Sequence, residues 1–126
     1  MRRKLLDKGY DPVLIGEVIE RLRADKLVDD RRYVETFIGY HAARGHGPLR
    51  VRADLRKIGL ADELIGAGID AYGRWDERLR EARQKKFGAA LPTLYADKQR
   101  QARFLGYRGF TGAQIRMALG IDADID

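Results

Sequence analysis

The sequence predicts an all-α protein built from tandem three-helix repeats, in three copies of which the first is incomplete. Three observations support this prediction. Helix-forming residues dominate the 126-residue chain, which contains only three Pro. Apolar and polar residues do not alternate over any sustained stretch, so β-strands have little support. Glycine recurs at intervals of fifty residues, at Gly9, Gly59 and Gly109, which indicates an internal repeat.

The predicted repeat unit is a helix, a turn that contains the glycine, and a second helix. A glycine just past a helix adopts the left-handed conformation at little steric cost, so it ends the first helix. The apolar residue after each glycine is expected to fold back onto that helix. Apolar residues match across the three copies at four further offsets: Leu5, Leu55 and Leu105; Tyr10, Leu60 and Phe110; Ile15, Ile65 and Ile115; Ile19, Ile69 and Leu119.

The second helix of each copy has its own start signal. Asp11 is expected to cap the first copy, with Pro12 at the first helical position, where its missing N–H costs nothing. Thr111 is expected to cap the third copy and to form a capping box with Gln114. Ala61 stands at the corresponding place in the second copy and is a poor cap.

A further helix is expected between the hairpins. Asp29 or Asp30 is expected to cap a helix that runs to about Arg44, before a Gly-His-Gly break and a new helix at Pro48. Asp76 is expected to open the equivalent helix of the next copy. The expected helices are 2–8, 12–25, 30–44, 48–58, 62–73, 76–88, 91–106 and 112–120. The predicted domains are an incomplete repeat at 1–28, complete repeats at 29–73 and 74–121, and an acidic tail at 122–126.

Residue content argues against catalysis and against a cofactor. The chain has no Cys, Ser or Asn, which excludes disulfides, thiolate metal sites and serine or cysteine nucleophiles. The two histidines, His41 and His46, are five apart and do not share a helix face, so we predict no metal site. No apolar run approaches the ~20 residues that span a bilayer, and there is no signal-peptide core. We therefore expect a cytoplasmic protein without a cofactor.

The basic residues are the most informative functional signal. The formal net charge is +6, and acids are absent from Thr36 to Ala53 and from Lys98 to Ile121. Equivalent helices of stacked repeats would place their basic faces side by side, which favours a surface for an anionic partner over ordinary solubilising charge. The candidate binding residues are Arg44, Arg50, Arg52, Arg56, Lys57, Lys98, Arg100, Arg103 and Arg108.

Helical periodicity also predicts which apolar residues face inward. On the helix opened by Pro48, the inward residues are expected to be Val51, Leu55 and Ile58, and on the helix before Gly109 they are expected to be Leu94 and Leu105. Four aromatic residues occupy core-like repeat positions: Tyr33, Phe37, Phe104 and Phe110. Tyr107 is harder to place in a core and could stack on a base or on a partner side chain.

Three motifs, in order and at the expected intervals, resemble the RecX family. The first is Leu6-Asp7-Lys8-Gly9-Tyr10, followed by Val18-Ile19-Glu20-Arg21-Leu22 and by Leu27-Val28-Asp29-Asp30 with Tyr33. The second is Gly45-His46-Gly47-Pro48 with Arg50, Val51, Leu55, Gly59 and Leu60. The third is Arg103-Phe104-Leu105-Gly106-Tyr107-Arg108-Gly109-Phe110-Thr111. The resemblance covers nearly the whole chain. Members of this family usually have a further helix before Arg3, which matches the incomplete first repeat.

The resemblance implies a fold and a function. RecX proteins are curved, elongated arrays of three-helix repeats that bind within the groove of the RecA–DNA filament. They inhibit strand exchange and ATP hydrolysis by blocking filament extension, by promoting disassembly, or by both, and they have some affinity for single- and double-stranded DNA. We therefore expect a monomeric negative regulator of RecA in a bacterial cytoplasm. The alternative is a stand-alone basic helical module that binds DNA.

Overall fold

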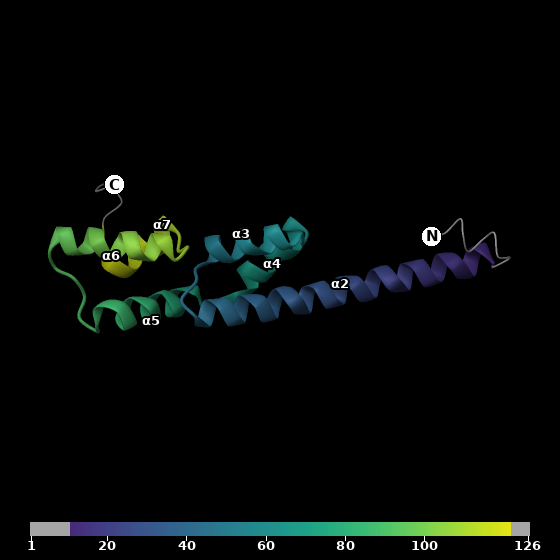
Figure 1. Cartoon of the computed structure of the whole chain (residues 1–126), viewed down its shortest axis with the longest axis horizontal. Coiled ribbons are helices and arrows are strands. Elements are labelled where there is room, and N and C mark those ends of the chain that lie inside the picture. The colour runs from purple at the N-terminus through teal and green to yellow at the C-terminus, as the bar shows by residue number, and fades with distance from the viewer. Residues whose placement is uncertain (1–10, 122–126) are drawn as a thin grey trace. The chain divides into compact units, whose positions relative to one another are not determined.

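The computed structural model describes residues 11–121, and this part of the chain contains α-helices and no β-strand (Figure 1). The predicted all-α class is therefore confirmed. The helices are α2 (Pro12–Ala43), α3 (Pro48–Ile58), α4 (Asp62–Tyr72), α5 (Trp75–Phe87), α6 (Tyr95–Tyr107) and α7 (Gly112–Leu119). Three predicted segments lie outside the described residues: the helix 2–8, the turn at Gly9 and the tail 122–126.

The prediction of two separate helices at 12–25 and 30–44 was wrong, because both segments belong to the single helix α2. Asp29 and Asp30 lie inside this helix and do not cap a new one. The sequence between Ala24 and Asp30 contains no Gly or Pro, so nothing in it interrupts the backbone hydrogen bonds of the helix. The start of α2 is as expected, since the Val13 N–H donates to the Asp11 carboxylate at 2.8 Å.

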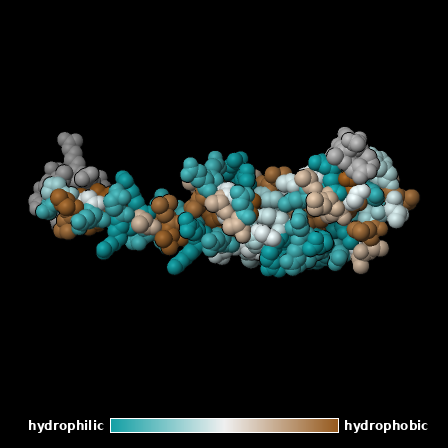
Figure 2. All heavy atoms as spheres, turned by 180° about the vertical axis from the view of Figure 1, so that it is seen from behind, coloured by the Kyte–Doolittle hydropathy of each residue, from teal (hydrophilic) through white to brown (hydrophobic). Residues whose placement is uncertain are grey.

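The chain divides within α2 into two compact units, one up to Tyr33 and one from Val34 onwards. The part of α2 in the first unit exposes several apolar side chains, which interrupt its hydrophilic surface (Figure 2). Val13, Leu14, Val18 and Leu22 are each about half exposed or more. Ile15 is buried.

The second unit contains two hydrophobic cores, one for each three-helix group. The first core joins the end of α2 to α3 and α4, and the Trp75 indole N–H donates to the Ile69 carbonyl oxygen at 2.9 Å across it. Gly68 lets α4 approach α2 closely, because a Cβ at this position would lie 2.6 Å from a methyl carbon of Val34. The buried residues of this core are Val34, Ile38, Ala42, Val51, Leu55, Ile65, Ile69 and Trp75.

The second core lies among α5, α6 and α7 and contains Leu79, Leu105, Phe110, Ile115 and Leu119. The predicted capping box at the start of α7 is present. The Gln114 N–H donates to the Thr111 hydroxyl at 3.1 Å, and the Thr111 N–H donates to the Gln114 side chain at 2.9 Å. Gly59 and Gly109 both have left-handed backbone, with φ of 97° and 98°, as the repeat predicts.

Two predicted inward residues are instead exposed. Ile58 is 50% exposed because it is the last residue of α3, where the Gly59 turn ends the helix. Leu94 is 67% exposed because it precedes α6 with an extended backbone. The helix starts at Tyr95 and not at 91, since Pro92 disfavours helical backbone at Leu91.

Three of the four aromatic residues expected in the core are buried or partly buried there, and one is not. Phe110 is buried, and Phe37 and Phe104 are partly buried against the two cores, as expected. Tyr33 is 47% exposed, so the prediction that it lies in the core was wrong. Tyr107 is 84% exposed, as its position between Gly106 and Arg108 suggests.

Candidate anion-binding surface

A backbone junction connects the two three-helix groups of the second unit. The Gly47 N–H donates to the Arg108 carbonyl oxygen at 2.7 Å, and the Leu49 N–H donates to the Gly109 carbonyl oxygen at 2.9 Å. These bonds join the start of α3 to the turn that follows α6. As a result α6 and α3 follow one another in a row, with the C-terminal end of α6 at the N-terminal end of α3 (Figure 1).

Glycine permits this close backbone approach. A Cβ on Gly47 would overlap the main chain of Gly109 and Phe110. A Cβ on Gly109 would lie 2.5 Å from the Arg50 Cβ and 2.7 Å from its backbone nitrogen. The Gly-His-Gly-Pro segment is therefore more than a helix break, because it forms the contact surface between the two repeats.

The junction brings three of the predicted cations together, and we call Arg44, Arg50 and Arg108 the junction cluster. Arg50 packs on Gly109, the residue after Arg108. Aromatic rings hold the other two side chains: the Arg44 guanidinium lies 4.3 Å from the centre of the Tyr40 ring, and that of Arg108 lies 5.2 Å from the centre of the Phe104 ring. None of the three forms an ion pair with an acid among residues 11–121.

The two histidines meet close to this cluster, since the charges of Arg50 and Arg108 act on His46. Their Nδ1 atoms are 3.2 Å apart and their rings are stacked, while His41 also packs on Phe37. Burial lowers the pKa of His46, and the positive charges of Arg50, His41 and Arg108 lower it further, whereas Asp54 opposes them. Helical periodicity does not describe the spacing of His41 and His46, because His46 lies beyond the end of α2.

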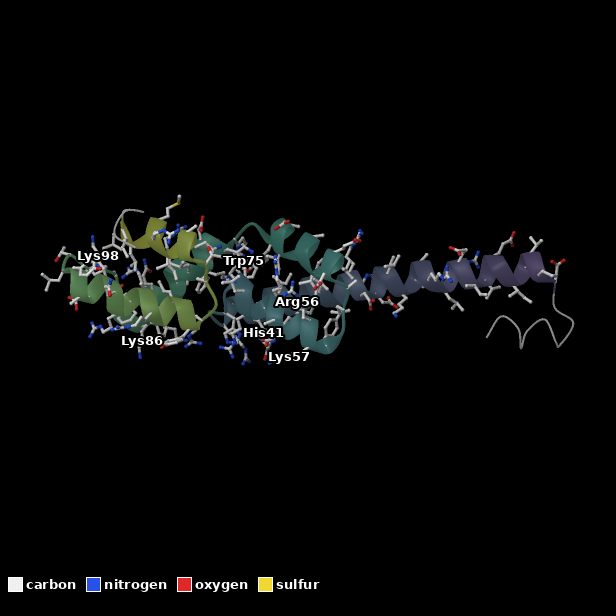
Figure 3. The ribbon with its side chains drawn as sticks, turned by 90° about the horizontal axis from the view of Figure 1, so that it is seen from above. His41, Arg56, Lys57, Trp75, Lys86 and Lys98 are labelled. Carbon is white, nitrogen blue, oxygen red and sulfur yellow. The ribbon has the colours of Figure 1, made fainter. Side chains whose placement is uncertain are left out.

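The remaining predicted residues of α3 differ in their surroundings. Arg56 is not an isolated cation, because its Nε forms an ion pair with Asp62 at 2.8 Å. Arg52 is half-buried and Lys57 is exposed. Lys57 and His41 lie along the same edge of the unit as Lys86 (Figure 3).

The predicted residues of α6 diverge around the helix. Arg100 is 3.7 Å from Asp97 and lines a hollow with Lys86, Phe87 and Phe104. Arg103 instead lines a different hollow, with Arg116 of α7. Lys98 lies near the start of α6, away from the edge that carries Lys86 (Figure 3). The nine predicted cations therefore do not form one uniform strip.

Helix α5 adds cations that the sequence analysis missed. A groove of about 400 Å³ lies beside the junction cluster, and Lys85 and Lys86 form part of its wall. The full lining is Ala43, Arg44, Gly45, Arg78, Glu81, Ala82, Lys85, Lys86, Phe104 and Arg108. The chain has no acid from Ala82 to Ala96, so the criterion used for the other two stretches would also have found this pair.

Other kinds of site have no support in the described part of the chain. Residues 11–121 contain no group of three or more side chains that could hold a metal ion. Among the helices in that range, none is long and apolar enough to cross a membrane. What the described residues do offer is concentrated basic charge on a helical scaffold.

The fold and this surface place the chain among helical-repeat proteins that carry a basic surface. Family comparison makes the assignment specific. Residues 29–69 match the second three-helix domain of RecX, and residues 75–119 match the third three-helix domain of RecX. The first match begins inside α2, so its first helix is the C-terminal part of that long helix.

Curated relatives agree with this assignment. The chain is 38% identical over 119 residues to the regulatory protein RecX of Halorhodospira halophila, covering 94% of this chain and 74% of the relative. It is 42% identical over 111 residues to the regulatory protein RecX of Pseudomonas savastanoi pv. phaseolicola, covering 87% and 72%. The chain belongs to the RecX family. Its relatives are named as regulatory proteins.

Proposed function

We propose that this protein is a negative regulator of RecA that binds the RecA–DNA filament and inhibits recombinase and ATPase activity. It does so by blocking filament extension or by promoting disassembly. The observation that carries the proposal is membership of the RecX family over both complete three-helix groups. The protein acts by binding and not by catalysis, as a monomer in the bacterial cytoplasm.

The basic residues supply the contact with the filament. The row of α6 and α3 carries most of the predicted cations, and the junction cluster lies where the two helices meet. A filament of RecA on DNA presents phosphate and carboxylate charge, so attraction to this row is long-ranged and weakens as salt rises. The proposed contact residues are Arg44, Arg50, Arg52, Arg56, Lys57, Lys98, Arg100, Arg103 and Arg108.

The sharpest test is a titration of this protein into RecA that is hydrolysing ATP on single-stranded DNA. We expect ATP hydrolysis to fall at protein concentrations too low to coat the DNA. The control is binding of the protein to the same DNA without RecA, measured at the same salt concentration.

The two readouts separate the proposal from its alternative. A stand-alone DNA-binding module would inhibit only at concentrations that saturate the DNA itself. Inhibition that follows DNA occupancy, or no inhibition at all, would contradict the proposed function.

A further inference from the structure

We infer that the groove beside the junction cluster binds carboxylate side chains of a protein partner, through Arg44, Lys85, Lys86 and Arg108. This inference rests on the proposed function, because the partner is the protein component of the filament and not its DNA. None of these four residues forms an ion pair with an acid among residues 11–121. The groove, of about 400 Å³, is large enough for one or two side chains.

The groove already contains one carboxylate. Arg78 donates from its Nη1 to Glu81 at 2.9 Å and from its Nε to the Tyr72 hydroxyl at 2.9 Å. Glu81 is therefore an example of a carboxylate that a guanidinium in the groove wall binds. The same acid would repel the closely spaced phosphates of a nucleic acid more than it would repel a single carboxylate.

The aromatic ring in the groove lining, that of Phe104, favours a protein ligand over a base. Single-stranded nucleic acid is usually held by exposed ring faces on which bases stack. Here Phe104 lies in edge contact with Phe87, and cations from Lys86 and Arg108 lie 5.8 and 5.2 Å from the centre of its ring. Its faces are therefore used to position cations. The rest of the floor is apolar and small, with Ala43 and Ala82, which suits the aliphatic part of a glutamate or a neighbouring apolar side chain.

The test is a double charge reversal, Lys85→Glu with Lys86→Glu. The matched control is Arg31→Glu with Arg32→Glu, an adjacent exposed pair on α2 with the same change in charge. Each variant is measured by fluorescence anisotropy against a RecA filament on oligo(dT) and against labelled oligo(dT) alone. Because acids at a helix C-terminus oppose its dipole, Lys85→Gln with Lys86→Gln and a thermal melt check that any loss does not come from unfolding.

We expect the groove variant to lose about tenfold or more in affinity for the filament and to retain its affinity for oligo(dT) to within the change seen in the control. Equal losses against the filament and the oligonucleotide would overturn the inference, because they would make the groove a DNA site. Unchanged filament binding would also overturn it. In that case inhibition of RecA by the unmodified protein would still support the proposed function.

A peptide probe distinguishes the two failures. A short labelled peptide of alternating Glu and Leu should bind the unmodified protein and bind the groove variant less well, with no RecA present. If the unmodified protein fails to inhibit RecA but this difference persists, the proposed function fails and the acidic-ligand site stands. If the peptide does not distinguish the proteins, the groove is not a carboxylate site.

Discussion

Single residues at the repeat junction decide whether its two backbones can touch. Gly109 has a φ of 98° and faces Arg50, so Gly109→Ala adds both backbone strain and a steric overlap. Gly47→Ala adds overlap alone, against the main chain of Gly109. We expect each change to lower stability by about 1–3 kcal/mol, with Gly109→Ala the more severe. Thermal denaturation followed by circular dichroism measures the loss.

Gly66→Ala is the control for these variants. Gly66 lies inside α4, and a Cβ there would meet nothing within 4 Å. Alanine should therefore be neutral or stabilise the helix by up to ~1 kcal/mol. A melting temperature for Gly109→Ala equal to that of Gly66→Ala would show that the junction does not depend on glycine.

His46 gives stability a pH dependence. Burial and the neighbouring positive charges lower the pKa of His46, so the unfolded chain binds this proton more readily than the folded protein does. Stability therefore rises with pH. The contribution of neutral His46 to stability is fully present above the ordinary histidine pKa of about 6.5 and is lost as pH falls below that value. We expect a lower midpoint of urea denaturation at about pH 5.5 than at about pH 7.5.

His46→Gln tests the origin of this effect. Glutamine carries no charge at either pH, so the variant should lose part of the difference between the two midpoints. A difference as large as that of the unmodified protein would assign the effect to other groups.

At the scale of an element, Arg83 connects α5 to the segment that precedes α6. Its side chain is buried and donates to the carbonyl oxygens of Ala89 and Ala90, at 3.1 and 3.2 Å, and to the Gln101 side chain at 3.4 Å. Arg83→Leu would leave these acceptors without their donor. We expect a loss of about 1–3 kcal/mol and faster amide hydrogen exchange between residues 88 and 95.

Arg80→Leu is the matched control on the same helix, since Arg80 is exposed. It should change stability by no more than ~0.5 kcal/mol. Similar losses in the two variants would mean that Arg83 contributes only as a helix-surface residue. This role could not be predicted from the sequence, because only the fold distinguishes a buried arginine from an exposed one.

Most helix boundaries could be predicted because they depend on local chemistry. Pro12, Pro48 and the Thr111–Gln114 capping box mark helix starts, and the repeat glycines mark ends. The continuity of α2 could not be predicted in the same way. An aspartate is a good cap but is also tolerated within a helix, so Asp29 and Asp30 alone do not decide between two helices and one.

At the scale of the whole molecule, the candidate surface was only partly predictable. Acid-free stretches identify regions of positive charge, and they led to the three residues of the junction cluster. They do not reveal that Arg56 is paired with Asp62, or that Arg103 lies in a different hollow from Arg100. Those facts depend on how helices pack. Lys85 and Lys86 lie in a third acid-free stretch, so their positive charge could have been predicted, but their place in the groove wall depends on packing.

Our main proposal is that a localised basic surface of this protein binds the RecA–DNA filament. Its most direct test compares Arg50→Glu with Arg100→Glu, as a double variant, against the control pair Arg21→Glu with Arg23→Glu from the first unit. Filament binding is measured by fluorescence anisotropy across a range of salt concentrations. We expect the first variant to lose about tenfold or more in affinity while the control loses little, and we expect salt to reduce this difference. Equal losses in the two variants would contradict a localised surface.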